Sequence, residues 1–378
     1  MSGDLSGVPW PANTRAAFDV DAPMTVGLEE ELMVLDAATL DLAPRAAELL
    51  DRAGGDPRFK PELPAAQLEI VAPPARTVGE AAAALAEARI ALSALAGEDT
   101  LLAGAGAHPF AALEGVLSTG ARYEAIARRY GSIARRQLVF GLHVHAAVRP
   151  ADRALAVYNA LRSYLPLLAA LAANAPFHGG RDTGLASVRP TLCSLLPRQG
   201  VPPPIASFEQ LDEALDWGER AGAMLVRSQW WWEARLHPGF GTVEVRVPDT
   251  QTTVGETAAI AAVVHALVTW LAERYAAGEE LPVAPSWRIA ENRSSACREG
   301  LEGTMADLVT GEVRPTRAWA AELLDDLAEA AQRAGCGAEL AAARDGLGAN
   351  GASRQREVAA RRGSLTALTS WLAGRFLG

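Results

Sequence analysis

The stretch from Thr242 to Asp249 alternates between valines and polar residues with the two-residue period of a β-strand. Its three valines fall on one face, and the opposite face carries Thr242, Glu244 and Arg246. A solvated edge strand would carry lysine and mixed polar residues on its outer face instead. The pattern therefore predicts a strand whose valine face is buried and whose charged face belongs to a site.

Three further stretches separate their faces in the same way. Residues 25–35, 67–71 and 139–148 each set two polar side chains opposite apolar ones, and these pairs are Glu29 with Glu31, Gln67 with Glu69, and His143 with His145. If the four strands share one sheet with helices on the apolar side, carboxylates, imidazoles and an arginine gather on the other side. That composition is typical of a divalent-metal and phosphate site. The alternation also places Glu30 on the apolar face, where it has no evident partner.

The order of the expected elements favours an α+β fold. Strands are interspersed with helices without strict β-α-β alternation, and burial of the strands on one side favours an antiparallel sheet. Residues 1–22 contain prolines and no periodicity, so we expect them to form a flexible leader. We expect residues 23–378 to form a single domain, in which residues 315–378 are helical.

Composition excludes several classes of function. The net charge of −10 argues against a nucleic-acid partner, because phosphate contacts need a basic surface. Three scattered cysteines, Cys193, Cys297 and Cys336, make neither a disulfide framework nor a metal clip, so we expect a cytoplasmic protein. The first residues lack the pattern of a secretory signal. Arg162 and His265 interrupt the longest apolar tracts, which predicts buried helices and no membrane spans.

Lysine is almost absent from this chain. Lys60 is the only one, and all other basic side chains apart from the histidines are arginines. A Walker A loop needs a lysine after glycine, and protein kinases need one on a strand, so neither site fits this sequence. If the protein handles nucleotide phosphates, arginines and metal ions must bind them.

Each polar feature also has a purely structural explanation when it is considered alone. Two glutamates on one strand face can be solvated, two histidines can be structural, and Glu244 can form an ion pair with Arg246. A zinc site would need a third histidine or cysteine at suitable spacing, and none is present. The tryptophans at 230–232 are more typical of a core than of a ligand platform. Arg181 and Arg189 lie in a long connection, residues 174–204, of the kind that is either functional or disordered.

Eight segments, in order along the chain, carry a resemblance to a known family. They are G-L-E-E-E-L (27–32), P-E-L-P-A-A-Q-L-E (61–69), G-A-H-P-F (106–110), G-L-H-V-H (141–145), R-D-T-G-L-A-S (181–187), W-W-E-A-R (231–235), G-T-V-E-V-R-V-P-D-T (241–250) and N-R-S-S-A-C-R-E-G-L-E-G (292–303). With these segments the chain resembles the carboxylate–amine ligases of the glutamate–cysteine ligase type 2 family. The resemblance implies a fold similar to the catalytic domain of glutamine synthetase. That fold has a curved antiparallel sheet whose polar face holds ATP and metals, with helices on the other face.

The resemblance also implies roles for individual residues. Glu31, Glu62 and Glu69 would hold one Mg²⁺, and Glu29, His143 and Glu244 a second, with Mn²⁺ as a substitute. The implied nucleotide contacts are His145, Arg181, Arg189, Asn292 and Arg293. The implied catalytic groups are Glu244, Arg235 and Arg246, and the two arginines would steady the transferred phosphoryl group. Two departures stand out: the spacing from Glu62 to Glu69 is one residue shorter than in glutamine synthetase, and Glu233 occupies a position where the family usually has aspartate.

The implied reaction is ATP-dependent amide formation between small-molecule substrates. ATP would convert the γ-carboxylate of glutamate to an acyl phosphate, and the amine of cysteine would then displace phosphate to give γ-glutamylcysteine. The residues leave three alternatives open: a ligase that uses another amine, a phosphotransferase resembling guanidino kinases, and a non-catalytic metal or nucleotide binder. The resemblance further implies a homodimer.

Overall fold

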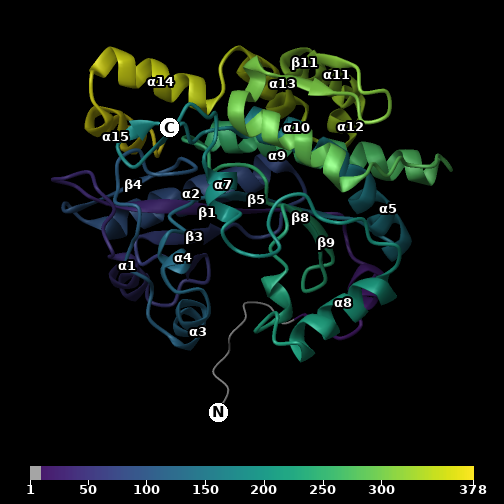
Figure 1. The fold of residues 1–378 in the computed structure, drawn as a ribbon, viewed down its shortest axis with the longest axis horizontal. Coiled ribbons are helices and arrows are strands. Elements are labelled where there is room, and N and C mark those ends of the chain that lie inside the picture. The colour runs from purple at the N-terminus through teal and green to yellow at the C-terminus, as the bar shows by residue number, and fades with distance from the viewer. Residues whose placement is uncertain (1–9) are drawn as a thin grey trace.

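A central antiparallel sheet organises the protein, whose computed structural model describes residues 10–378 (Figure 1). Its strand order is β2-β3-β1-β5-β9-β8, and β4 pairs with β1 outside this order. The strands are β1 (Val26–Asp36), β2 (Phe59–Pro61), β3 (Gln67–Val71), β4 (Thr100–Ala103), β5 (Leu142–Ala147), β8 (Ala234–His237) and β9 (Thr242–Val245). All neighbouring strands in it run antiparallel. The expected α+β class with an antiparallel sheet is confirmed.

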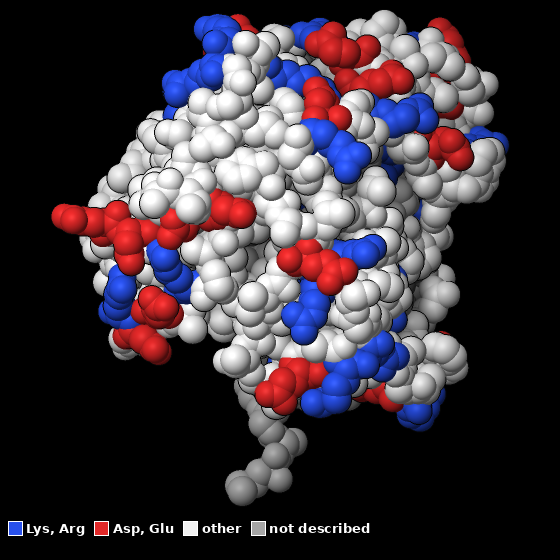
Figure 2. Space-filling view, turned by 60° about the vertical axis from the view of Figure 1, so that its left-hand side comes forward, with Lys and Arg blue, Asp and Glu red and all other residues white. Residues whose placement is uncertain are grey.

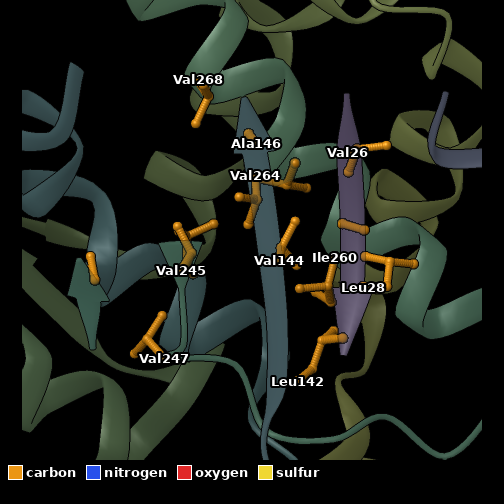
Figure 3. Packing of buried hydrophobic residues seen from close by; sticks show 14 of the residues in the cluster. Val26, Leu28, Leu142, Val144, Ala146, Val245, Val247, Ile260, Val264 and Val268 are labelled. Atoms are coloured by element: carbon orange, nitrogen blue, oxygen red, sulfur yellow. The ribbon is translucent and has the colours of Figure 1, made fainter. Parts of the chain in front are cut away.

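Helices cover the apolar face of this sheet. The largest buried cluster includes residues of α2 (Val78–Ala96), α5 (Ala151–Leu161) and α9 (Val254–Ala276). Figure 3 shows side chains of α9 lying against apolar residues of the sheet, with Ile260, Val264 and Val268 facing Val26, Leu28, Leu142, Val144, Ala146, Val245 and Val247. Thr253 and Glu256 cap the start of α9 reciprocally, each side chain accepting the other's backbone N–H. One face of each strand is thus committed to the core.

The remaining elements surround this core. The helices are α1 (Ala46–Arg52), α3 (Ala121–Tyr130), α4 (Ser132–Arg135), α6 (Leu165–Ala172), α7 (Arg189–Cys193), α8 (Phe208–Arg220), α10 (Ser286–Glu299), α11 (Thr316–Asp326), α12 (Ala328–Arg333), α13 (Gly337–Asp345), α14 (Gly351–Arg362) and α15 (Leu365–Gly374). Two short hairpins pair β6 (Phe177–His178) with β7 (Arg181–Asp182) and β10 (Thr304–Ala306) with β11 (Val313–Pro315). Short 3-10 turns lie at Arg15–Phe18, Arg162–Tyr164, Arg227–Gln229, Gly300–Glu302 and Gly346–Gly348.

The expectation of a flexible leader over residues 1–22 is wrong where the structure describes it. Residues 1–9 lie outside the described part, but Trp10, Thr14 and Phe18 are all buried. The ring of Phe18 contacts that of Phe208 at a centroid separation of 5.2 Å, and Trp10 meets His237 edge-on at 5.2 Å. The sequence of this segment shows no periodicity because its backbone is irregular. Its aromatic side chains nevertheless anchor it to the rest of the fold.

Two stretches, Ala151–Ala172 and α9, are long and apolar enough to cross a membrane by length and composition alone. In each of them 72% of the most apolar window is buried inside the fold. Arg162 lies within the first stretch and donates to the backbone oxygen of Pro202 at 2.9 Å. Both stretches therefore act as core helices in this structure.

The positive charges on the surface of this protein come from arginine, where most proteins also use lysine. The face shown in Figure 2 carries acidic and basic side chains next to each other. Arg333 pairs with Glu273, Arg356 with Asp182, and many other surface arginines pair with acids in the same way. An arginine without such a partner is therefore a candidate for contact with a ligand.

Candidate active site

The register of the sheet brings the predicted polar residues onto one face. Glu29 lies opposite His143, and Glu31 lies opposite Glu69. The carboxylate of Glu244 has two neighbours across the sheet, because its residue pairs with His145 on one side and with Arg235 on the other. Side chains from five strands thus meet above a sheet whose other face is apolar.

Three groups of these side chains are tight enough to hold a metal ion, each with its ligand atoms within 4.8 Å of one another. They are Glu31–Glu62–Glu69, Glu29–Glu69–His143 and Glu29–His145–Glu244. The first is the set expected for one Mg²⁺. The second expected set, Glu29 with His143 and Glu244, is divided between the other two groups. The reason is that Glu29 of β1 lies opposite His143 of β5, whereas Glu244 of β9 lies opposite His145 of the same strand. His145 therefore joins the candidate metal ligands.

The charges of this cluster are poorly balanced by protein groups. Burial, with repulsion from Glu29 and Glu62, raises the pKa of Glu69 well above its usual value. Burial and the charge of Glu62 raise the pKa of Glu31 to about 7. Burial opposes ionisation of Glu29 as well, but His145 and His143 hold the pKa of Glu29 well below its usual value. Buried carboxylates that repel one another in this way are stabilised by a cation.

The two imidazoles are suited to metal binding. Burial and the charge of Arg246 lower the pKa of His143 to about 4, so its ring is neutral near pH 7. Nε2 of His143 and Nε2 of His145 are buried and have no hydrogen-bond partner among the described residues. Nε2 of His145 lies 3.6 Å from Glu29 Oε1, while its Nδ1 lies 2.9 Å from the Thr242 hydroxyl. Imidazoles with free nitrogens, next to carboxylate oxygens, fit a divalent cation such as Mg²⁺ or Mn²⁺.

Glu244, Arg235 and Arg246 form a buried triad of charges beside the cluster. Arg235 donates to both oxygens of Glu244 and also to the backbone oxygens of Ser228 and Trp230. Arg246 donates to Glu244 through Nη1 alone, and its residue also lines a cavity. The two arginines outweigh the effect of burial, so the pKa of Glu244 lies well below its usual value. Arg235 is committed to protein partners, whereas Arg246 is available to a ligand.

Two cavities lie on either side of the cluster. The first, named the Glu31 cavity, has a volume of about 130 Å³ and is lined by Glu31, Glu62, Gln67, Arg122, Tyr123, Gln137, His143, Arg189, Gln199, Trp231, Glu233 and Arg246, among others. The second, named the Phe240 cavity, has a volume of about 360 Å³ and is lined by Glu29, Arg58, Pro73, Pro74, His145, Phe240 and Thr242, among others. The Phe240 cavity is mainly apolar, and the Glu31 cavity is rich in charge.

Gly141, directly before β5, lies close to the side chain of Arg189. Its backbone N–H donates to the carboxylate of Glu31, and a Cβ at this position would lie 2.1 Å from Nη2 of Arg189. Arg189 is buried and donates to the backbone oxygens of Arg246 and Val247. The small size of Gly141 thus leaves room for Arg189 to bind the backbone that follows β9. The backbone N–H of Gly141 holds Glu31 in place.

Comparison with known proteins connects this site to a family. The profile described as "Glutamate-cysteine ligase family 2(GCS2)" matches residues 25–370. The chain belongs to this family. The expected resemblance is confirmed, and the protein is a ligase of the glutamate–cysteine ligase type.

Relatives and solved structures agree with this family membership. Over 362 residues the chain is 39% identical to a provisionally named glutamate–cysteine ligase 2-3 of Rubrobacter xylanophilus, covering 94% of this chain and 98% of that protein. It is 34% identical over 360 residues to a provisionally named glutamate–cysteine ligase 2 of Gloeobacter violaceus, covering 93% and 97%. A glutamate–cysteine ligase of Francisella tularensis, solved in complex with AMP, has a TM-score of 0.69 at 13% identity over 95% of this chain and 89% of that one. A bifunctional glutathione synthetase of Pasteurella multocida has a TM-score of 0.69 at 15% identity, covering 94% and 52%. The two structures share the fold of this ligase family member.

Two residues expected to contact the nucleotide lie elsewhere in this ligase. Arg181 is exposed in the β6–β7 hairpin and is not among the residues that line the two cavities. The side-chain amide of Asn292 bonds to both backbone groups of Ala306, so it fastens α10 to β10. A nucleotide contact for Arg181 and Asn292 stays a prediction. Arg293 lies near the Glu31 cavity but is paired with Glu233.

Sequence reasoning missed Arg122 and the role of Trp231 in the family site. Arg122 lies in α3, half-buried in the wall of the Glu31 cavity, and its guanidinium forms no ion pair or hydrogen bond within residues 10–378. The basic face of the helix over residues 119–130 is the only signal for it in the sequence. Trp231 lines the same cavity, and the guanidinium of Arg198 lies 5.8 Å from its ring.

Proposed function

We propose that this protein is an ATP- and Mg²⁺-dependent ligase that joins the γ-carboxylate of glutamate to the amine of cysteine. The observation that carries the proposal is the cluster of acids and imidazoles between two cavities, in a chain of this ligase family. The Nε2 atoms of both imidazoles have no hydrogen-bond partner among the described residues. Residues 23–378 would act as one catalytic domain, and the described residues before them pack onto it.

Magnesium would be held by the three groups of acids and histidines. Glu31, Glu62 and Glu69 would form one site, and Glu29 would share a second with His145 and Glu244 or with His143 and Glu69. When bound, magnesium neutralises phosphate oxygens and so favours transfer of the γ-phosphoryl group. Between the metals and Arg246 the protein would surround that group with positive charge.

ATP is expected to enter from the Phe240 cavity. Its apolar walls, with Phe240, Pro73 and Pro74, suit a flat base, and its inner end is formed by Glu29 and His145. The AMP in the Francisella ligase supports a nucleotide substrate for this fold. A nucleotide placed in this way would direct its phosphates over the metal cluster toward Arg246.

Glutamate would occupy the Glu31 cavity. Arg122, which forms no ion pair within residues 10–378, would bind the α-carboxylate of glutamate, and the γ-carboxylate of glutamate would then face Arg246. The γ-carboxylate oxygen attacks the γ-phosphorus of ATP, ADP leaves, and an acyl phosphate forms. The amine, after its ammonium form loses a proton, attacks the acyl carbon, and the C–O bond to phosphate breaks. The products are an amide, phosphate and ADP.

The proposal is tested by the dependence of ADP release on the amine. Purified protein is mixed with Mg-ATP and glutamate, and ADP is measured with and without cysteine, while the product is identified by mass. We expect stoichiometric ADP and γ-glutamylcysteine only when cysteine is present. A stable phosphorylated product formed without any amine would identify a phosphotransferase instead, and a different amine with a much lower KM would replace cysteine.

A further inference from the structure

An ion pair separates the Glu31 cavity from a third cavity. Glu233, directly before β8, is bound by Nε and Nη2 of Arg293 in α10, with an Nε–Oε2 distance of 2.9 Å. The side chain of Arg293 is 14% exposed and that of Glu233 is 9% exposed. Glu233 lines the Glu31 cavity, and Arg293 lines the third cavity, whose volume is about 440 Å³. Gln199 lines both, so this pair forms a shared wall.

The residues that line the third cavity would favour the entry of a carboxylate. Arg298 stands at its edge, 58% exposed, with the carboxylate of Glu299 no closer than 3.9 Å. Trp287, which is 65% exposed, and Ser286 and Ser294 also line it. No acidic residue is among the residues that line this cavity. Its electrostatic potential therefore favours anionic groups.

A zwitterion can take the place of an ion pair with little change in charge balance. An α-amino acid carries an ammonium group and a carboxylate on adjacent positions, the same two charges that Glu233 and Arg293 now supply to each other. If the ligand's ammonium binds Glu233 and its carboxylate binds Arg293, both buried side chains keep a partner. A simple amine would satisfy Glu233 and leave Arg293 without a partner.

We propose that the third cavity admits the acceptor substrate and that this acceptor is an α-amino acid, bound by Glu233 through its ammonium and by Arg293 through its carboxylate. The inference rests on the proposed function and adds the cavity through which the acceptor enters and the residues that would select it. Because Glu233 also lines the Glu31 cavity, an amine held there faces the cavity in which the acyl phosphate would form.

The test compares cysteine with cysteamine, which has the same amine and thiol and no carboxylate. Replacing Arg293 in R293M is expected to raise KM for cysteine by about 10- to 100-fold, the usual effect of losing a charged hydrogen-bonded pair. KM for cysteamine should not change. E233Q should raise KM for both acceptors, because both bind as ammonium ions. The matched control is R288M, which alters an exposed arginine on the same helix α10 that does not line the third cavity.

Hydroxylamine separates failure of this inference from failure of the proposed function. It is a small neutral nucleophile that converts an acyl phosphate to a hydroxamate without needing Glu233 or Arg293. Hydroxamate formed from glutamate and ATP at wild-type rate by R293M shows that the variant is folded and makes the acyl phosphate. If R293M is active in this way and its ratio of KM values for cysteine and cysteamine equals that of the wild type, the inference is overturned.

A wild-type protein that forms no hydroxamate from glutamate would overturn the proposed function itself. R293M leaves the buried carboxylate of Glu233 unpaired, which can impair folding. If R293M loses hydroxamate formation, the double variant E233Q/R293Q, which contains neither charge, is measured in the same way. It should show no preference between cysteine and cysteamine, and a preserved preference for cysteine would contradict the inference.

Discussion

Glu30 and Arg89 form an ion pair in which neither side chain is exposed to solvent. Arg89 Nη2 lies 2.6 Å from Glu30 Oε1, and Arg89 Nε lies 2.8 Å from Glu30 Oε2. The pair lies on the helix side of the sheet, opposite Glu29 and Glu31, and Thr257 of α9 donates to the same carboxylate. Arg89 also donates to the backbone oxygens of Thr252 and Phe376. The middle acid of the G-L-E-E-E-L segment therefore fastens α2, α9 and the end of the chain to β1.

Replacing Arg89 with methionine should destabilise the protein by about 3–5 kcal/mol, because it leaves a buried carboxylate without its partner. Urea unfolding followed by circular dichroism would measure the loss. R362M, which changes an exposed arginine that has no ion pair within residues 10–378, should leave the midpoint unchanged. Equal midpoints for R89M and R362M would show that the pair contributes nothing to stability.

Stability without metal should depend on pH through the acids of the cluster. The pKa of Glu31 is about 7 in the folded protein, raised from the ordinary value of 4.5 that applies to the unfolded chain. A raised folded-state pKa means that the fold binds this proton more tightly, so the contribution to stability is complete below pH 4.5 and is lost as pH rises through 7. Bound Mg²⁺ would reverse this loss, because it would stabilise the ionised carboxylates.

The rise in Tm on addition of Mg²⁺ should therefore be larger at pH 8 than at pH 5.5, as measured by differential scanning calorimetry against EDTA. E31Q should reduce the difference between the two pH values. E87Q, which changes an exposed glutamate of α2, should preserve it. An equal rise in Tm at both pH values would argue against ion binding by these carboxylates.

Arg246 and Arg235 should respond differently to replacement. In R246M the phosphoryl group would lose the proposed contact, so kcat should fall by about 10²- to 10³-fold. Because Arg235 still neutralises Glu244, Tm should change little. R235M should instead lower Tm, since this side chain links Glu244 to the backbone of Ser228 and Trp230. Steady-state kinetics and calorimetry on both variants would decide the assignment, and a full loss of kcat with unchanged Tm in R235M would reverse it.

Arg122 should determine the affinity for glutamate. We expect R122M to raise KM for glutamate by about 10- to 100-fold, because one charged hydrogen-bonded contact is lost. KM for ATP should stay at its wild-type value, since the nucleotide is assigned to the other cavity. R128M, on the exposed side of the same helix α3, is the matched control. A parallel rise of both KM values would place Arg122 at the nucleotide.

The polar face of the sheet could be predicted because strand periodicity is a local property. Glu29, Glu31, Glu69, His143 and Glu244 were assigned to one face from residues two positions apart, and the register places them there. Which of these residues share one metal ion was harder to predict from the sequence, because it depends on how β5 is aligned with both β1 and β9. That alignment put His145, in place of His143, beside Glu244.

Contacts between segments far apart in the chain were beyond the sequence patterns. Nothing near Glu30 indicates Arg89, which lies 59 positions away, and nothing near Glu233 indicates Arg293, which lies 60 away. Trp10 and Phe18 were missed for another reason: an irregular segment can be anchored by single aromatic side chains without any periodicity. Arg181 was assigned by its motif, and a motif does not state which way a hairpin turns its side chains.

Glu29 and Glu69 each belong to two of the three groups that can bind an ion. Ions held by neighbouring groups would compete for, or bridge, the same carboxylate oxygens, so occupancy at one position changes the affinity at the next. Titration with Mn²⁺ should accordingly deviate from independent sites. Ions that share ligands in this way would bind one after another, and the register of the sheet would determine which position fills first.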